Sequence, residues 1–331
     1  MATNVPYDLD AAADLTDLSI QQIWLKSPAD LKEYHKEYYY VEPVTDYIVK
    51  DSSITSIDAF SRIPEHGSIP ADSPHQGFDK SYTQMFFSGM LRVTRQLWRY
   101  GIQARRLENM VTELKNNAIR FKEQVLANVW INGGSTSYTE TQGKFAYAVT
   151  NTGGDGLAFQ SNAHTREDGG NNWSNRVTDG TTINMDFDYD AWKAALQTAQ
   201  AILGGVGEIL DVKLDKLLCK KESSVHHRAQ EILTSIRKGE KPGTADRDGA
   251  IANAFDIVAN PYFSSDIVWG AFDSSKVGPR FGLQLKQGMP LQLDPQFIDY
   301  DTKEIKYSAG NDFTYGFNDV RNHVRSTGAN A

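Results

Sequence analysis

One uninterrupted amphipathic run, Ile102 to Ile131, constrains the fold more than any other part of the chain. Its apolar residues recur at alternating steps of four and three, which keeps them on one face of an α-helix. No proline interrupts the run, and Asn132, Gly133 and Gly134 follow it with residue types that close helices. The residues that we expect to form the packed face are Leu107, Val111, Leu114, Ala118, Phe121 and Val125.

The expected helix over 102–131 is unusually long. About 30 residues at about 1.5 Å each give a rod of roughly 45 Å, whereas the mean globular helix has about 11–12 residues. Such a helix is either the spine of a whole subunit or one member of an antiparallel bundle. Because the chain on both sides has strand and loop patterns, we favour a single spine with sheets packed along it.

Composition excludes several classes of protein. The 331 residues include 34 basic and 42 acidic side chains, a formal net charge of −8, which argues against a dedicated DNA-coating or membrane-coating surface. The single cysteine, Cys219, excludes intramolecular disulfides. No basic-then-apolar leader and no run of about 18 apolar residues is present, so we expect a soluble protein kept in the cytoplasm.

The first 45 residues have the composition of a peripheral segment. Pro43 stops any helix there, and only Ile20, Ile23, Trp24 and Leu25 offer an apolar anchor. The acidic residues of the segment alternate with small and apolar ones at Asp8, Asp10, Asp14 and Asp17. We expect an extended arm with one or two short helices that lies on another surface, such as that of a neighbouring subunit.

A long hairpin is expected next. Residues 51–60 have β-branched alternation, a turn-rich segment with several prolines follows, and Phe87, Leu91 and Val93 alternate with polar residues in a second strand. A two-stranded ribbon with so little apolar area is marginal on its own in water. We therefore expect the hairpin to project and to lie on a partner surface, rather than to be an ordinary surface hairpin.

The remainder interleaves helices and strands without a strict period, which is typical of the α+β class. Residues 143–180 are rich in loop-forming residues. Helices are expected from Tyr189 to about Leu203, capped by Asp188 or Asp190, and after Ser223 and Ser224. Short strands are expected at 214–219, 255–259, 267–272, 281–285 and 313–317.

Candidate metal sites are weak. Asp186, Asp188 and Asp190 have the spacing that opens a calcium loop, but Ala191 stands where glycine is needed and Gln197 where a bidentate glutamate is needed. Helix capping is the favoured interpretation. His226 and His227 are neighbours on a helix, about 100° apart, so one metal ion does not easily use both. We expect no metal, no cofactor and no catalytic residues, and hence no enzyme.

A basic cluster is open to two interpretations. One is a patch that touches phosphate, and the other is intersubunit salt bridging or a solvated hinge before the spine. The second is favoured because the chain as a whole is acidic. The cluster, which has Trp98 and Tyr100 among its members, consists of Arg92, Arg95, Arg99, Arg105 and Arg106.

The order of these elements resembles the major capsid protein family of tailed bacteriophages, which has the Hong Kong 97-like shell fold. Several stretches also resemble the family in amino-acid sequence, and the resemblance covers nearly the whole chain. The stretches concerned are Phe87 to Leu97 entering the spine, Ala127 to Gly133 closing it, Asp155 to Phe159 with the following His164, Val268 to Asp273, and Gly316 to Arg321.

This resemblance implies an α+β fold divided into named parts. Residues 1–45 would be the N-terminal arm and 46–95 the extended β-hairpin, or E-loop. Residues 96–187 and 298–331, with the spine helix 102–131, would form the peripheral domain, and 188–297 the axial domain. The protein would assemble with itself into hexamers and pentamers of an icosahedral or prolate shell around packaged double-stranded DNA, which it would touch weakly and non-specifically.

The resemblance also implies partners and a location. No scaffolding segment precedes the arm, so either a separate scaffolding protein acts or the chain is already processed, and Met1 favours the separate protein. The other expected partners are a portal, with or without a decoration protein, and no membrane. Assembly would occur in the host cytoplasm and the product would be the virion. Some members crosslink a hairpin lysine, but no matching motif surrounds Lys80, so we expect no crosslink. Two alternatives stay open: a bacterial nanocompartment shell of the same fold enclosing protein cargo, and a non-assembling nucleic-acid-binding protein using the arginine cluster.

Overall fold

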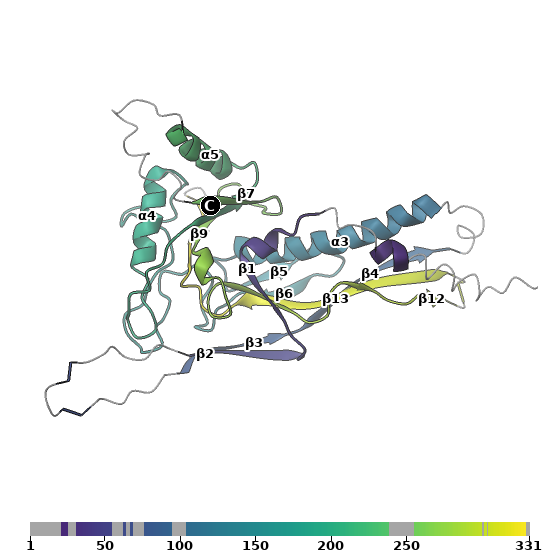
Figure 1. Ribbon diagram of the computed structural model, residues 1–331, viewed down its shortest axis with the longest axis horizontal. Helices are drawn as coiled ribbons and strands as arrows, with labels where there is room; N and C mark the ends of the chain where they lie inside the picture. The colour runs from purple at the N-terminus through teal and green to yellow at the C-terminus, as the bar shows by residue number, and fades with distance from the viewer. Residues whose placement is uncertain are drawn as a thin grey trace, which may run out of the picture.

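The structure, a computed structural model, describes residues 21–25, 31–54, 62–63, 67–68, 76–94, 104–237, 255–299, 301–302 and 304–328. Helix α3, Ala104–Ile131, is its longest helix and lies along a sheet (Figure 1). The helix closes where glycines follow, and the Asn132 amide still donates to the Asn128 carbonyl at 2.9 Å. The predicted spine helix is thus present, with the predicted end.

A six-stranded sheet forms the larger layer beside α3. Its long central strand, β13, is antiparallel to β4 on one side and to β10, β11 and β12 on the other, and β1 adds to β10 in parallel. The strands are β1 Tyr39–Pro43, β4 Met85–Val93, β10 Leu283–Gln287, β11 Gln292–Leu293, β12 Phe297–Ile298 and β13 Ile305–Phe317.

Alternation along β13 produces one core face and one open face. Tyr307 and Phe313 are buried, whereas Lys306 and Ser308 stay partly exposed. From β4, the Phe87 ring lies 4.5 Å from the Phe313 ring and 5.3 Å from the Phe121 ring of α3, measured between centroids. The core between helix and sheet is therefore aromatic. The opposite face is open along Lys306 and Ser308, whereas at Thr314 and Gly316 it is buried where β3 packs on it.

A second, four-stranded sheet has the order β14-β9-β7-β8, and two helices pack against it. The elements are β7 Lys216–Lys220, β8 Asp256–Asn260, β9 Trp269–Phe272, β14 His323–Ser326, α4 Tyr189–Gln200 and α5 Ser224–Arg237. The Asp188 side chain accepts a 2.7 Å bond from the Ala191 amide, which confirms the predicted cap. Helix α4 ends at Gln200, three residues before the predicted end, and the chain turns there.

The expected hairpin has a different second strand. Strand β2, Ile48–Ile54, pairs with β3, Gln76–Thr83, while Met85–Val93 forms β4 in the large sheet. The prediction that 87–93 returns along the hairpin is wrong, because Gln84 breaks the strand and its amide bonds the Tyr47 carbonyl at 2.9 Å. The β2–β3 ribbon lies along the lower edge of the body in Figure 1, beside β13.

Part of the expected arm belongs to the chain's own core. Residues Tyr34–Glu37 form the 3-10 helix η1, which leads into β1, and Tyr38 and Tyr39 are buried. The Glu123 carboxylate on α3 accepts bonds from the His35 amide at 3.1 Å and meets His35 Nδ1 at 2.5 Å. The expectation that this part of the arm lies on another subunit is wrong, because the Tyr38 and Tyr39 side chains anchor it in the core of its own chain.

Two further differences concern residues that looked loop-like or separable. Residues Ser137–Glu140 and Tyr147–Thr150 form a small hairpin, β5 and β6, at the start of the region expected to be loop-rich. Strand pairing also crosses the expected boundary at residue 297. Strands β10 and β11 lie before it yet pair with β13, whereas β14 lies after it and pairs with β9.

Candidate functional site at the base of the hairpin

The β2–β3 ribbon has one face turned to the body and one turned to solvent. In the register Asp51↔Lys80 and Val49↔Tyr82, directly opposed residues share a face. Tyr82 is only 2% exposed and Lys80 is partly buried, whereas Ser81 and Thr83 on the other face are exposed. The alternation therefore anchors the ribbon at its base and leaves its outer face open.

Lys80 anchors the ribbon through an unusual environment. Its ammonium donates to the Thr152 carbonyl and lies 5.1 Å from the ring centroid of Phe317 and 5.6 Å from that of Tyr82. Burial lowers the pKa of Lys80 to about 8, and the Asp155 carboxylate offsets only part of that effect. The charged form is thus held where water is scarce, beside two aromatic faces.

A second lysine supports the ribbon from β10. Lys286 is 3% exposed, its ammonium lies 2.5 Å from a carboxylate oxygen of Glu42 on β1, and it sits 5.7 Å from the Tyr82 ring centroid. Tyr82 is therefore held by cations from both the ribbon and the sheet. Only the lysine of this pair is buried, so removing Glu42 would leave a buried ammonium without its carboxylate.

The structure brings together two sequence stretches that are about 160 residues apart. His164 Nδ1 lies 2.7 Å from Asp155 Oδ2, and the His164 ring stacks on Trp173 at 4.5 Å between centroids. Asn318 contacts the base of the ribbon, where its side-chain amide donates to the Phe78 carbonyl at 3.3 Å. Ribbon, loop and carboxyl-terminal segment meet around a small cavity.

A buried ionic cluster closes that cavity. Arg321 is 2% exposed and donates to both oxygens of Glu167, at 3.0 and 2.6 Å, and to Asp319 at 2.7 Å. Burial by itself lowers the pKa of Arg321, but Asp319 and Glu167 together raise it above its ordinary value. A bidentate pair fixes geometry as well as charge, so this cluster holds the wall of the cavity in one arrangement.

Two glycines let the ribbon approach. A Cβ on Gly154 would lie 2.6 Å from the Phe78 Cβ and 2.1 Å from Asn318 Oδ1, and one on Gly153 would lie 2.9 Å from the Asn318 carbonyl oxygen. All three distances are shorter than a real Cβ atom allows. The close approach explains why glycines stand in this loop.

Of the five arginines of the predicted basic cluster, the structure describes the side chain of Arg92 alone. Arg92 is an exposed residue on the open face of β4, and it makes no ion pair with another described residue. Arg95 and Arg99 lie outside the described residues. Arg105 and Arg106 belong to the backbone of α3, but their side chains lie outside the described part, so the cluster stays a prediction.

The residues of the expected packing face of the spine helix differ in how deeply they are buried. Val111 and Val125 are 1% and 0% exposed, while Leu114, Ala118 and Phe121 are only partly buried. The side chain of Leu107 lies outside the described residues. Sequence periodicity did not indicate that the carboxyl-terminal third of α3 is buried on several sides, with Leu126, Ala127 and Trp130 all fully covered.

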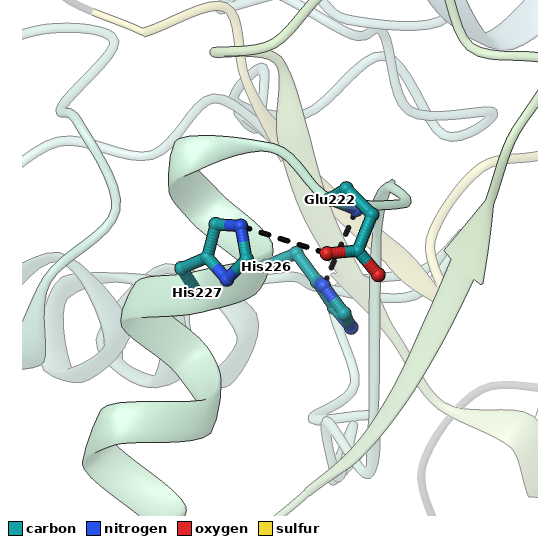
Figure 2. A group of neighbouring side chains, drawn as sticks. All are labelled: Glu222, His226 and His227. Carbon is teal, nitrogen blue, oxygen red and sulfur yellow. Dashed lines mark hydrogen bonds and ion pairs between the residues drawn. The ribbon is translucent and has the colours of Figure 1, made fainter.

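Glu222, His226 and His227 form the one cluster in the described part of the chain with three candidate metal-ligand atoms close together, and Figure 2 shows them. His226 Nδ1 accepts the Glu222 amide at 3.3 Å, and its Nε2 lies 3.2 Å from the Gln230 amide. His227 Nε2 is 3.7 Å from the Glu222 carboxylate. Both His226 nitrogens are thus engaged within the chain, Nδ1 by the turn before α5 and Nε2 by a side chain one turn further along the helix, which favours a structural role.

Sequence reasoning missed the inner face of β3. Phe78, Lys80 and Tyr82 alternate with Asp79, Ser81 and Thr83, a period-two pattern that was available just before Met85. The contact between Gly154 and Asn318 could not be predicted from the residues of either stretch. In the described part of the chain, no helix is both long enough and apolar enough to cross a membrane.

Comparison with known proteins identifies the fold. No family model and no curated protein matches the chain. The capsid of cyanophage P-SCSP1u matches 88% of this chain and 86% of its own at 10% identity, with a TM-score of 0.51. A structure from Microbacterium phage Oxtober96 matches 89% and 90% at 10% identity, with a TM-score of 0.50. A virus-like particle from Pyrococcus furiosus matches 93% and 98% at 8% identity, but its TM-score is only 0.44.

The chain therefore has a phage capsid-protein fold. The predicted resemblance to tailed-phage major capsid proteins and the predicted mixture of helices and sheets are confirmed at the level of the fold. The Hong Kong 97-type arm, E-loop, peripheral domain and axial domain stay predictions.

Proposed function

We propose that the protein is the major capsid subunit of a tailed phage, which assembles with itself into hexamers and pentamers of a closed shell around double-stranded DNA. The observation that carries the proposal is the shared fold with a cyanophage capsid over almost the whole of both chains. In this proposal the β2–β3 ribbon is the core of the E-loop, and the 188–297 region supplies most of the axial domain.

The build of the ribbon supports a role between subunits. Its base is fixed by Lys80 and Tyr82, while its outer face, with Ser81 and Thr83, covers nothing in the described part of the chain. A two-stranded ribbon is marginal alone, so a firm base with an open outer part favours contact with a neighbour. Shell building needs broad self-complementary surfaces rather than a catalytic pocket, and we propose no enzymatic activity.

The other components stay part of the proposal. A scaffolding protein and a portal would act with this subunit, with or without a decoration protein, and the virion would be its final location. The arginine cluster would touch DNA or an adjacent subunit. The shell would pass between discrete packed states as DNA enters, as bistable subunit interfaces allow.

Electron microscopy of the purified protein tests the proposal. The protein is expressed alone and together with its neighbouring genes, and the absorbance of the particles reports nucleic acid. We expect uniform closed shells, filled with DNA when the neighbouring gene products are present. Closed shells that hold protein cargo would favour the nanocompartment instead. A protein that stays monomeric under both conditions, with nucleic-acid binding that falls steeply with salt, would favour the third alternative.

A further inference from the structure

Strand β4 has one edge that no described strand covers. It pairs with β13 along its whole length, from Met85↔Phe313 to Val93↔Ile305, and with nothing on its other side in the described part of the chain. The edge is long, and it is more apolar than the edges that proteins usually leave open. Phe86 is 63% exposed and Met90 58% exposed. An uncovered row of backbone donors and acceptors on such a strand is a template for another strand.

The two faces of β4 differ in character. Phe87, Gly89 and Leu91 point toward α3, where a Cβ on Gly89 would touch Leu114 at 3.4 Å. Phe86, Ser88, Met90 and Arg92 point to the open face, and all four are exposed. A strand added at this edge would have to offer apolar side chains to the first face and tolerate polar ones on the second.

We propose that the occupant of this edge is β4 of a second copy, paired antiparallel about a two-fold axis at Gly89. The proposal rests on the proposed self-assembly and names one of its contacts. Gly89 is the midpoint of Met85–Val93, so this register pairs every residue of the strand. It places Phe87 opposite Leu91 of the second copy and Met85 opposite Val93, so that apolar residues meet beside the helices.

The same register makes the open face self-complementary. It places Phe86 of each copy opposite Arg92 of the other, twice in one dimer, which suits a guanidinium on an aromatic face. Arg92 makes no ion pair in the described part of its own chain, so it is available for that contact. Because residue i meets residue j and j meets i, the contact is isologous and closes on itself.

The helices fit beside such a dimer. Helix α3 lies over β4 and β13, and strands in a sheet are about 4.8 Å apart. A helix centred between these two strands would lie about 4.8 Å from the two-fold axis, so the two copies of α3 would be about 10 Å apart. Packed helices are separated by about 8–10 Å. The joined sheet would thus be continuous across two subunits, with both spines packed on one face.

Cysteine trapping in assembled particles tests the register. The double variant Ser88→Cys with Met90→Cys places each new thiol opposite its complement in the second copy, and we expect a covalent dimer after mild oxidation. Cys219 is buried and does not interfere. The matched control, Ser137→Cys with Thr139→Cys, has the same spacing on an exposed face of β5, away from β4 and from the ribbon, and should give no dimer. A dimer with Ser88→Cys alone would show pairing about Ser88 and would overturn the Gly89 register.

Charge reversal gives a second readout in native particles. Phe86→Lys places like charges opposite each other at two points and should lower the yield of assembled particles about tenfold. Adding Arg92→Glu restores opposite charges and should restore the yield. Both positions are exposed, so the subunit should fold in either case. Normal shells with no trapped dimer and no charge effect would overturn this contact and leave the shell function intact. Monomers throughout, without a dimer, would overturn both proposals.

Discussion

At the scale of single residues, the base of the hairpin depends on the absence of one side chain. Gly154 lies so close to Phe78 and Asn318 that a Cβ would overlap both, and Asn318 in turn holds the Phe78 carbonyl. The loop can move away only by breaking the contact between the ribbon and the carboxyl-terminal segment. A single methyl group is therefore expected to loosen the whole anchor.

Gly154→Ala should lower the free energy of unfolding by about 1–3 kcal/mol, the usual cost of overpacking. It should also increase hydrogen exchange in residues 76–83. The measurements are denaturant unfolding and exchange followed by mass spectrometry. Gly278→Ala is the matched control, because the nearest atom to its added Cβ is 4.0 Å away. Equal behaviour of the two variants would show that the anchor tolerates the methyl group.

Lys80 should leave a signature in the pH dependence of stability. Its pKa is about 8 in the folded chain and about 10.4 when unfolded. Between these values the unfolded chain binds more protons, so the contribution of Lys80 to the free energy of unfolding rises with pH. Below pH 8 both states are charged and the full penalty of burying the ammonium is present.

The difference in free energy of unfolding between the native protein and Lys80→Met isolates this effect, because other titrating groups are common to both. We expect the difference to grow in favour of the native protein between pH 8 and about 10.4 and to be constant below pH 8. A difference that is independent of pH throughout would show that Lys80 is solvated.

At the scale of elements, the spine helix is more deeply buried at its carboxyl-terminal end than along the rest of its length. Its carboxyl-terminal part is enclosed by both sheets and by η1, whereas residues before Val125 have one flank near solvent. Arg325 completes the enclosed end. It is 1% exposed and donates to the Ile131 carbonyl at 2.8 Å, where the negative end of the helix dipole lies.

Because burial differs along α3, the same substitution should lower the free energy of unfolding by different amounts at different positions. Val125→Asp places an unpaired carboxylate in the core and should cost at least about 3 kcal/mol, whereas Leu114→Asp, at a partly buried position, should cost less. Asn117→Asp on the exposed flank should stay within about 0.5 kcal/mol of the native protein. Denaturant midpoints measure all three. If Leu114→Asp costs as much as Val125→Asp, solvent does not reach the middle of the spine.

At the scale of the whole molecule, η1 and β1 hold the two sheets together. Tyr38 accepts a 3.0 Å bond from Asn260 at the end of β8, Tyr39 donates to the Leu126 carbonyl of α3 at 2.9 Å, and β1 adds to β10. One short segment therefore joins the spine and both sheets. A shell subunit that passes between packed states needs such internal rigidity, so that motion occurs at its interfaces.

Mature particles should show no covalent ladder on a denaturing gel. The Lys80 ammonium is engaged by the Thr152 carbonyl and two aromatic rings of its own chain, and is turned away from the open face of the ribbon. We expect a single monomer band after boiling in detergent. Bands at multiples of the subunit mass would contradict this expectation.

The sequence by itself determined the spine, the α+β class and about half of the strands. These follow from local patterns: apolar steps of three and four for α3, alternation for β10 and the end of β13, and a capping aspartate for α4. The order of the elements was enough to indicate a capsid fold.

Only the tertiary structure decided which strands pair and which buried polar groups meet. Met85–Val93 and Gln76–Thr83 alternate equally well, and the choice of partner for β2 depends on the break at Gln84. The meetings of His35 with Glu123, and of the Asp155 loop with Asn318, join residues far apart in the chain. Such contacts depend on how distant elements close over one another, and no local pattern of residues encodes that distance.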